Sequence, residues 1–404
     1  MLHTNCKQNV VCKSIQTDSR KALDGAVFLA LIGDNFDGHN YIKQAEKNGA
    51  VAIISSQKVT SNLPILQVKN TQIALAEIAK YHRQKIKPKV VAITGSNGKT
   101  TTKNMLANIL NLQAPTLKTQ GNFNNHLGVP MTLLKLNSKH QFAVIEMGAN
   151  HIGEIAYLRA IAEPDIAVVT NTLDAHIGEF GGFENLVKTK GEIYHKNSTN
   201  IVNTQTSFSG DISFGAGGNV FATNRKNNQF ELNIKAEKIS VKLQLLGQHN
   251  IENALAASAC AYVLGIDIKI IKQGLEATNA EKSRLDLIEK NGLKIIDDSY
   301  NASPSSSKYA LKVLANFGGE RVAILGQMAE LGSHSQALHA EVGNYAKSLN
   351  INYLYSIGSH AKEYKIQHFN SEKQLLKQLQ KHPNATLLFK GSRVAKLEKI
   401  IAKL

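Results

Sequence analysis

One stretch of the chain, residues 90–112, constrains its fold more than any other. It begins Val-Val-Ala-Ile-Thr-Gly-Ser-Asn-Gly-Lys-Thr-Thr-Thr and continues with apolar residues at helical spacing. A strand, a Gly-rich loop and a helix in this order are typical of a site for nucleotide phosphates. Gly95 and Gly98 permit a tight backbone turn, Lys99 adds positive charge, and the Thr100 hydroxyl is a candidate Mg²⁺ ligand. We therefore expect an α/β domain built around this phosphate loop.

The loop is a shortened version of the common phosphate-binding pattern. Ile93 stands where the full Walker motif has its first glycine, so the pattern is GxxGK[ST]. Asn97 and Thr101 lie within the same loop and are also expected to contact the nucleotide. The alternative is a strand-to-helix turn with a surface lysine. Candidate metal ligands elsewhere in the chain favour the phosphate site.

Those candidate ligands follow two predicted strands. Residues 142–148 predict a strand that presents Glu146 near its end, and residues 166–170 predict another, followed by His176. In open parallel sheets, ligands bind beyond the carboxyl ends of the strands. Thr100, Glu146 and His176 are therefore predicted to hold Mg²⁺ together. A histidine in a loop can equally be a solvated residue.

Composition limits the class of protein. The chain has 404 residues, enough for two or three domains, and a net charge of +16 from 47 Lys and Arg against 31 Asp and Glu. The basic residues are dispersed and there is no Trp, so we expect no nucleic-acid partner. Cys6, Cys12 and Cys260 show no metal-binding spacing. The absence of a long apolar run and of a secretory signal predicts a cytoplasmic protein without integral membrane contact.

Residues 1–84 are predicted to form a first α/β domain. Strands are expected over residues 27–31 and 51–54, with a helix over residues 41–48 between them. Two polar clusters could be ordinary loop tips, or could bind a nucleotide diphosphate and its base. The candidate residues in these clusters are Ser19, Arg20, Asn35 and Phe36.

Residues 85–284 are predicted to form the central domain. The loop over residues 121–130 is rich in asparagine, which suits either ligand binding or turn geometry. Residues 201–243 favour strands with a small antiparallel region. Asn250 and Asn253 share one face near the start of a helix, where they could contact an adenine edge, although Asn250 could simply cap the helix. The loop amides expected to bind substrate are Asn122, Asn124 and Asn125.

Residues 285–404 are predicted to form a Rossmann-like domain. Four predicted strands alternate with helices, and each strand leads into a polar loop, which is typical of a parallel sheet. The loops at the strand ends should form the far wall of the nucleotide cleft. The predicted strands cover residues 293–298, 321–325, 353–357 and 386–389.

An ordered set of motifs resembles the Mur ligases of peptidoglycan synthesis over nearly the whole chain. In chain order the motifs are TDSR, TGSNGKTTT, GNFNNHLGVP, EMGANHIGEI, NTLDAHIGEF, KTKGEIY, GQHNIENALAA, DDSYNASP and LGQMAELG. The combination of GNFNNHLGVP, KGEI, DDSYNA and GQMAELG resembles the branch that adds D-alanyl-D-alanine. The resemblance implies an N-terminal domain for the UDP-sugar, a central ATPase domain, and a C-terminal domain that closes over ATP and the amine.

The resemblance also implies roles for single residues. Lys99 and Thr100 would bind ATP phosphates and Mg²⁺, with Glu146 and His176 holding the metal. Lys190 matches a lysine that is carbamoylated in several family members, although the sequence alone distinguishes neither Lys188 nor Lys190. Ser303 stands where the family more commonly has Asn. The residues implied to contact adenine, terminal phosphate and ribose are Asn250 and Asn253, Arg284, and Asp298, Tyr300 and Asn301 respectively; those implied for uridine are Ser19, Arg20, Asn35 and Phe36.

The activity implied by the resemblance is that of an ATP-dependent amide ligase. ATP would phosphorylate the terminal carboxylate of UDP-N-acetylmuramoyl-tripeptide, and D-alanyl-D-alanine would attack the acyl phosphate. We expect the chain to work as a monomer. One alternative is a folylpolyglutamate synthetase-like ligase, which should lack the TDSR-type N-terminal domain that this chain has. A nucleotide-switch or nucleic-acid-binding ATPase should show a full Walker motif and a dense basic patch.

Overall fold

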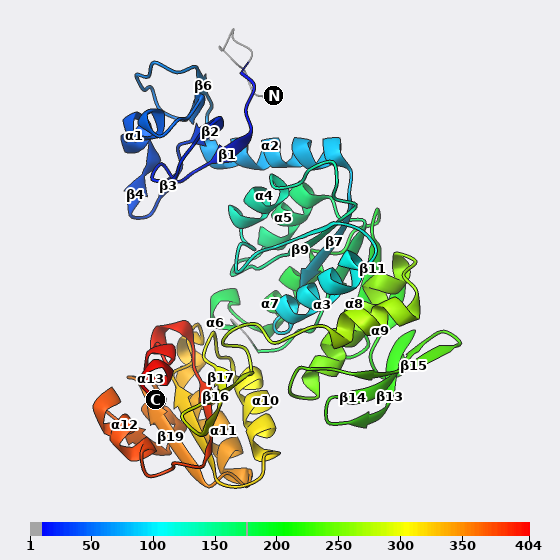
Figure 1. Cartoon of the computed structure of the whole chain (residues 1–404), viewed down its shortest axis with the longest axis vertical. Coiled ribbons are helices and arrows are strands. Elements are labelled where there is room, and N and C mark those ends of the chain that lie inside the picture. The colour runs from blue at the N-terminus through cyan, green and yellow to red at the C-terminus, as the bar shows by residue number, and fades with distance from the viewer. Residues whose placement is uncertain (1–9, 175–176) are drawn as a thin grey trace.

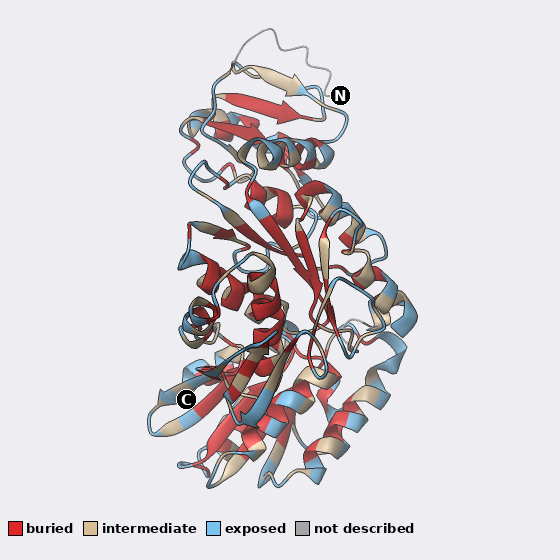
Figure 2. Cartoon of the chain, turned by 90° about the vertical axis from the view of Figure 1, so that its right-hand side faces the viewer, coloured by how far each residue is buried: buried red, intermediate tan, exposed pale blue. Residues whose placement is uncertain are grey.

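The computed structural model of the chain describes residues 10–174 and 177–404. It confirms the predicted α/β class, with three units that follow one another along the longest axis of the molecule (Figure 1). Each unit is built on its own sheet, and buried residues lie on the central strands and on the helices that pack against them (Figure 2). The proposed boundaries after residues 84 and 284 stay predictions.

The N-terminal unit has a parallel four-stranded sheet in the order β1-β2-β5-β6. All four residues of β2 are buried, which agrees with the apolar run in the sequence. Asn70 begins the long helix α2 by accepting hydrogen bonds from the backbone N–H groups of Gln72 and Ile73. The elements are β1 (Ser14–Gln16), β2 (Ala26–Leu29), the hairpin β3 (Ile32–Gly33) and β4 (Phe36–Asp37), η1 (Gly38–Tyr41), α1 (Ile42–Lys47), β5 (Ala52–Ser55), β6 (Ile65–Gln67) and α2 (Thr71–Ile86).

The central unit has a nine-stranded sheet in the order β15-β14-β13-β12-β11-β10-β7-β9-β8. Its strands are parallel except at one edge, where β13, β14 and β15 pair antiparallel, as predicted for residues 201–243. The parallel part comprises β7 (Lys89–Thr94), β8 (Thr116–Lys118), β9 (Phe142–Glu146), β10 (Ile166–Val169), β11 (Thr199–Asn203) and β12 (Ile212–Phe214); the edge comprises β13 (Val220–Lys226), β14 (Gln229–Ile234) and β15 (Glu237–Lys242).

Helices cover both faces of this sheet. Two separate apolar clusters pack on it, one against α3, α8 and α9 and the other against α4, α5 and α7. Helix α3 begins at Lys99, earlier than its apolar spacing suggested, because Gly98 before it adopts a left-handed conformation. The helices are α3 (Lys99–Asn111), α4 (Gly128–Leu133), α5 (Glu154–Ala162), α6 (Ile177–Phe180), α7 (Phe183–Gly191), α8 (His249–Val263) and α9 (Ile268–Glu276).

The C-terminal unit has a six-stranded sheet in the order β16-β17-β21-β18-β19-β20. It is parallel except for the edge strand β16, which the sequence did not reveal. Ser303 forms a capping box with Ser306 and, with Pro304 after it, starts α10. The elements are β16 (Asp286–Lys290), β17 (Leu293–Asp298), α10 (Pro304–Ala315), β18 (Arg321–Gly326), η2 (Gly332–His334), α11 (Ser335–Ser348), β19 (Tyr353–Ile357), η3 (Ala361–Tyr364), β20 (Gln367–Phe369), α12 (Glu372–Leu379), β21 (Thr386–Lys390), η4 (Arg393–Ala395) and α13 (Glu398–Lys403).

Two sequence expectations concern features outside the sheets. Within the described ranges, none of the helices has the length and apolar character needed to cross a membrane. Cys12 is an exposed free thiol and Cys260 a buried one. Cys6 lies outside the described residues.

Candidate active site

The phosphate loop connects β7 to α3, as predicted. Gly95 and Gly98 have φ angles of 141° and 80°, in the region that favours glycine. A Cβ on Gly95 would lie 2.0 Å from Thr170 Oγ1, and one on Gly98 would lie 2.1 Å from Asn253 Oδ1. Both glycines are therefore required by the conformation and by the packing around it.

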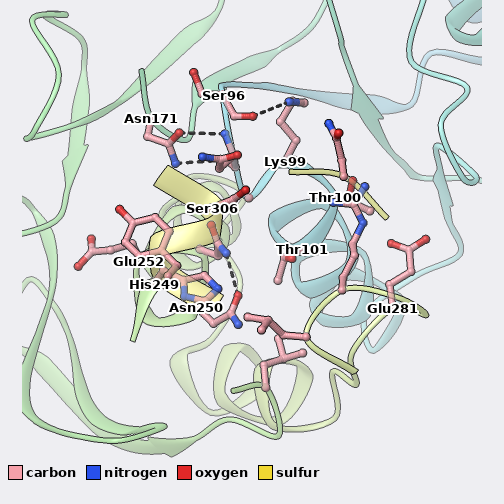
Figure 3. Close-up of a pocket in the computed structure, with 18 of the residues that line it drawn as sticks. Ser96, Lys99, Thr100, Thr101, Asn171, His249, Asn250, Glu252, Glu281 and Ser306 are labelled. Atoms are coloured by element: carbon pink, nitrogen blue, oxygen red, sulfur yellow. Dashed lines mark hydrogen bonds between the residues drawn. The ribbon is translucent and has the colours of Figure 1, made fainter. Parts of the chain in front are cut away.

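The loop is fixed by neighbouring strand ends. The Asn171 side chain accepts a hydrogen bond from Asn97 N (3.0 Å) and donates one to Asn97 O (3.1 Å). Lys99 Nζ donates to the carbonyl oxygens of Gly95 (2.7 Å) and Ser96 (3.1 Å), as Figure 3 shows for Ser96. Burial lowers the pKa of Lys99, and the nearby carboxylate of Glu146 acts in the opposite direction. The lysine thus lies folded along its own loop.

A cavity of about 590 Å³ opens beside the loop, in the size range of small-molecule sites. Its walls come from the phosphate loop, the start of α8 and the C-terminal unit. The residues predicted to bind ATP that line it are Asn97, Gly98, Lys99, Thr100, Thr101, Asn250, Asn253, Arg284, Asp298, Tyr300 and Asn301. The structure therefore brings together all but Gly95 of the predicted nucleotide contacts.

Polar contacts join the central and C-terminal units at this cavity. Asn97 Nδ2 donates to Ser305 Oγ (2.9 Å), and Ser305 N donates to Asp174 Oδ1 (3.2 Å). The ring of His249 stacks on that of Tyr309, with centroids 5.2 Å apart. Burial, reinforced by the charge of Lys390, lowers the pKa of His249 to about 4. Sequence analysis missed these contacts, because their partners lie on different units.

The two helix asparagines form a pair. Asn253 Nδ2 donates to Asn250 Oδ1 (2.9 Å), and Asn250 Nδ2 donates to Leu246 O (2.7 Å), so the two amides face each other at the cavity wall (Figure 3). Asn250 uses its side chain in this way at the start of α8, whose N-cap residue Gln248 makes no capping hydrogen bond with its side chain. The pair stands directly behind the phosphate loop, since Asn253 packs on Gly98.

The opposite wall carries charged residues of the C-terminal unit. Lys390 Nζ lies 2.7 Å from Asp298 Oδ2 and donates to Asn301 O at 2.7 Å. Burial raises the pKa of Asp298, while Lys390 beside it acts to lower it. The guanidinium of Arg284 lies 4.0 Å from the centroid of the Tyr300 ring. The cluster therefore places an ion pair and a cation stacked on an aromatic ring along this wall of the cavity.

Glu146 is buried at the end of β9, as a metal ligand at the sheet edge would be. Its Oε1 accepts a hydrogen bond from Asn124 Nδ2 (2.9 Å), whereas Oε2 has no hydrogen-bond partner. Lys103 Nζ, on α3, lies 3.5 Å from Oε2 and is itself buried. Lys103 was not among the site residues predicted from the sequence, although it stands one helical turn after Lys99.

The described residues contain no group of three or more His, Cys, Asp or Glu side chains that could hold a metal ion. His176, the third predicted metal ligand, lies outside the described residues. Glu146 and Thr100 both line the cavity. The Glu146 carboxylate, whose Oε2 has only the Lys103 ammonium at 3.5 Å as a partner, and the Thr100 hydroxyl are hard oxygen donors, which fits Mg²⁺.

Lys190 is buried on α7, in contrast to the exposed Lys188 two residues before it. Its ammonium lies 5.0 Å from the centroid of the Phe180 ring. Burial, together with the positive charge of Lys99, lowers the pKa of Lys190 to about 7. The structure thus distinguishes these two lysines where the sequence did not.

The predicted substrate amides have different positions. Asn122 and Asn124 line the cavity, and Asn124 also contacts Glu146. Asn125 instead accepts hydrogen bonds from the N–H groups of Leu127 and Gly128 at the start of α4. The turn role weighed for this loop is therefore realised at Asn125.

The N-terminal candidates lie away from this cavity. Arg20 forms an ion pair with Asp18 (2.8 Å), and Ser19 Oγ donates to Gln44 Oε1 (3.2 Å). Asn35 lies at the exposed tip of the β3–β4 hairpin, and Phe36, which follows it as the first residue of β4, is 53% exposed. These four residues are not brought into one cluster by any described contact.

Comparisons with known proteins identify the family. Residues 12–87 match the model "Mur ligase family, catalytic domain", residues 93–261 the "Mur ligase middle domain", and residues 283–393 the "Mur ligase, glutamate ligase domain". The chain belongs to the Mur ligase family. The family resemblance inferred from the motifs is thereby confirmed.

Relatives and solved structures agree with this assignment. Proteins of Haemophilus influenzae and Escherichia coli, both named UDP-N-acetylmuramoyl-tripeptide–D-alanyl-D-alanine ligase, are each 38% identical over 98% of this chain and 94% of their own length. A crystal structure of MurF from Acinetobacter baumannii has a TM-score of 0.94 at 38% identity, covering 98% of this chain and 94% of that one. MurF from Thermotoga maritima in complex with ADP has a TM-score of 0.89 at 29% identity, covering 98% and 97%. The Escherichia coli protein FolC, at 17% identity and a TM-score of 0.66, shares the fold.

Proposed function

We propose that this chain is an ATP-dependent amide ligase that joins D-alanyl-D-alanine to UDP-N-acetylmuramoyl-tripeptide. The main support is that relatives named for this activity are 38% identical over 98% of the chain. The cavity adds chemical support, because it combines a phosphate loop, a buried carboxylate and several cations. The products would be UDP-N-acetylmuramoyl-pentapeptide, ADP and phosphate.

In the first step, the terminal carboxylate of the tripeptide attacks the γ-phosphorus of ATP. An oxygen–phosphorus bond forms, the bond to ADP breaks, and an acyl phosphate results. Lys99 and the N–H groups of the loop at the start of α3 would stabilise the charge on the transferred group. Lys99 must turn from its carbonyl partners on Gly95 and Ser96 toward the phosphates to do so. We assign Arg284 to the terminal phosphate.

In the second step, the amine nitrogen of D-alanyl-D-alanine bonds to the acyl carbon. The carbon–oxygen bond to phosphate then breaks, and phosphate leaves with the electron pair. Two protons are lost as the ammonium becomes an amide nitrogen. Because acyl phosphates react with water, the contacts of Ser305 with Asn97 and Asp174 would help to close the cavity.

We assign the metal site to Glu146, Thr100 and His176. The oxygen donors of Glu146 and Thr100 fit Mg²⁺, although the ion would share Glu146 Oε2 with the ammonium of Lys103, which lies 3.5 Å away. When bound, Mg²⁺ would neutralise charge on the nucleotide phosphates. Asn124 would orient Glu146 through its hydrogen bond to Oε1.

We further propose that Lys190 is carbamoylated. A neutral lysine nitrogen reacts with CO₂, forming an N–C bond and releasing one proton, and the lowered pKa of about 7 makes the neutral amine accessible. The carbamate would be a carboxylate-like ligand near the phosphate loop. Incubating the protein with ¹³CO₂ should give a carbamate signal in ¹³C NMR. The same signal in a Lys190→Met variant would refute the assignment.

The remaining assigned residues would contact the two nucleotide-containing substrates, ATP and the UDP-linked peptide. We assign Asn250 and Asn253 to adenine, with Asp298, Tyr300 and Asn301 at the ribose, because all five line the cavity. We also propose that the chain acts as a monomer. Since ATP and UDP-sugars are cytoplasmic metabolites, we place the reaction in the cytoplasm. We assign the uridine contacts to Ser19, Arg20, Asn35 and Phe36. The remaining contacts on the UDP-linked peptide are assigned to Asn122, Asn124 and Asn125.

The decisive experiment measures phosphate release with ATP and Mg²⁺. UDP-N-acetylmuramoyl-tripeptide and D-alanyl-D-alanine are added separately and then together, and the product is identified by mass spectrometry. Release that requires both substrates, gives the pentapeptide and disappears in Lys99→Ala would support the proposal. Release without either substrate, or none with both, would refute it. Lys188→Ala is the matched control, because Lys188 is exposed.

A further inference from the structure

A carboxylate from the C-terminal unit also faces the nucleotide cavity. Glu330 lines this cavity and is exposed, and it belongs to the loop that follows β18. Its φ of 64° lies in the left-handed region, which is unfavourable for a non-glycine residue. Such a conformation persists where surrounding contacts impose it, and it is common at functional sites.

Buried groups hold this loop from inside the C-terminal unit. His339 Nε2 accepts a hydrogen bond from Met328 N (2.9 Å), and Ser392 Oγ accepts one from Ala329 N (2.9 Å). Tyr364 donates its hydroxyl proton to Gly326 O (2.9 Å). His339, Tyr364 and Ser392 are all buried, so the backbone just before Glu330 is firmly positioned.

The loop also docks on the central unit. A Cβ on Gly178, in α6, would lie 2.6 Å from Gly332 N, 2.7 Å from Leu331 C and 3.0 Å from Glu330 O. The approach of α6 to η2 is thus a close contact of backbone with backbone, at the point where the two units meet in Figure 1. It fixes the backbone of Glu330 against α6 of the central unit.

The charge of Glu330 matters at this position. It is near enough to Lys99 that its negative charge acts to raise the pKa of Lys99, against the larger effect of burial. Lys99 and Arg284 line the same cavity as Glu330, whereas the third cation of this wall, Lys390, is already paired with Asp298. An α-amino group with a pKa of about 8 enters as an ammonium ion at neutral pH. A carboxylate beside Lys99 would offset the repulsion between that ammonium ion and the lysine.

We propose that Glu330 binds the ammonium group of D-alanyl-D-alanine and positions its nitrogen toward the acyl phosphate. This inference rests on the proposed ligase function and names a contact for its amine substrate. Because Glu330 belongs to the C-terminal unit, the amine site is complete only when that unit is docked on α6. Glu330 thus links docking of this unit to recognition of the nucleophile.

The test compares Glu330→Gln with Glu289→Gln, a control that removes the same charge from an exposed site on the edge strand β16. KM is measured for ATP, UDP-N-acetylmuramoyl-tripeptide and D-alanyl-D-alanine. We expect Glu330→Gln to raise KM for D-alanyl-D-alanine about 10- to 100-fold, the value of one charge-assisted contact. KM for the other two substrates should stay within about twofold, and Glu330→Asp should restore part of the loss.

Hydroxylamine supplies a second readout, because it is uncharged at neutral pH and traps an acyl phosphate as a hydroxamate. Glu330→Gln should form hydroxamate at the wild-type rate. Equal loss of hydroxamate and pentapeptide would overturn the inference, because Glu330 would then act in acyl-phosphate formation. An unchanged KM for D-alanyl-D-alanine would also overturn it. If the wild-type protein forms no pentapeptide, the proposed function itself fails.

Discussion

The nucleotide cavity and the β3–β4 hairpin are both predicted ligand sites, yet they are built in opposite ways. Around the cavity, Ser96 Oγ both donates to Leu173 O (2.7 Å) and accepts from Leu173 N (2.9 Å). The side-chain amide of Asn171 bonds to both the backbone N–H and the carbonyl oxygen of Asn97. At the hairpin, Phe36 is 53% exposed, and the two strands β3 and β4 have only two residues each. The cavity residues support one another, whereas the hairpin tip has few neighbours.

This difference determines what a substitution can reveal. A change at the cavity disturbs packing, hydrogen bonds and ligand contacts together, so stability and activity should fall together. A change at the hairpin tip removes little from the folded protein. Any effect there should therefore appear in the affinity for one ligand alone.

The largest effect is expected for Gly98→Ala, which tests a close contact at the cavity wall. Its Cβ would meet Asn253 Oδ1 at 2.1 Å in a backbone with φ of 80°. We expect ATP binding to weaken more than about 100-fold, as measured by calorimetry. Gly217→Ala is the matched control, since Gly217 has a φ of 73° and nothing within 4 Å of its Cβ. Comparable loss in both variants would show that backbone strain, and not the contact with Asn253, is responsible.

The next effect concerns the buried pair of Lys103 and Glu146, whose charged atoms are 3.5 Å apart. Lys103→Met leaves a buried carboxylate without its counter-ion and should lower the free energy of unfolding by about 3–5 kcal/mol. Glu146→Gln should likewise destabilise, and the double variant should recover part of the loss. Urea unfolding provides the measurement.

An exposed ion pair provides the control for that experiment. Lys308 pairs with Glu341, whose side chain is 53% exposed, so Lys308→Met should cost less than about 1 kcal/mol. Similar costs for Lys103→Met and Lys308→Met would show that burial does not determine the strength of the Lys103 pair. Additive single and double variants would show that Lys103 and Glu146 are not coupled.

Local sequence patterns predicted much of the cavity. The glycines of the phosphate loop, the strand end at Glu146 and the spacing of Asn250 and Asn253 all depend on residues close together in the chain. Asn253 does bond to Asn250 three positions away, as helical geometry requires. Such features can be predicted because the local backbone fixes where their side chains point.

Features that depend on distant segments could not be predicted in the same way. Ser305 contacts Asp174 across 131 positions of the chain. Lys190 becomes distinct from Lys188 only when α7 packs, because both are helical lysines in the sequence. Asn125, by contrast, stabilises a turn through a residue only three positions away, and turn geometry was one of the two roles predicted for its loop.

The smallest effect on stability is expected at the hairpin tip, for Phe36→Ala. Because the ring is 53% exposed, its removal should change the free energy of unfolding by less than about 0.5 kcal/mol. If the ring stacks on the uracil base, KM for UDP-N-acetylmuramoyl-tripeptide should rise about tenfold while KM for ATP is unchanged. Tyr81→Ala is the control, because Tyr81 is 67% exposed on α2 of the same unit. Equal effects of the two variants, or a parallel rise in KM for ATP, would exclude Phe36 from uridine recognition and leave the cavity as the better defined of the two sites.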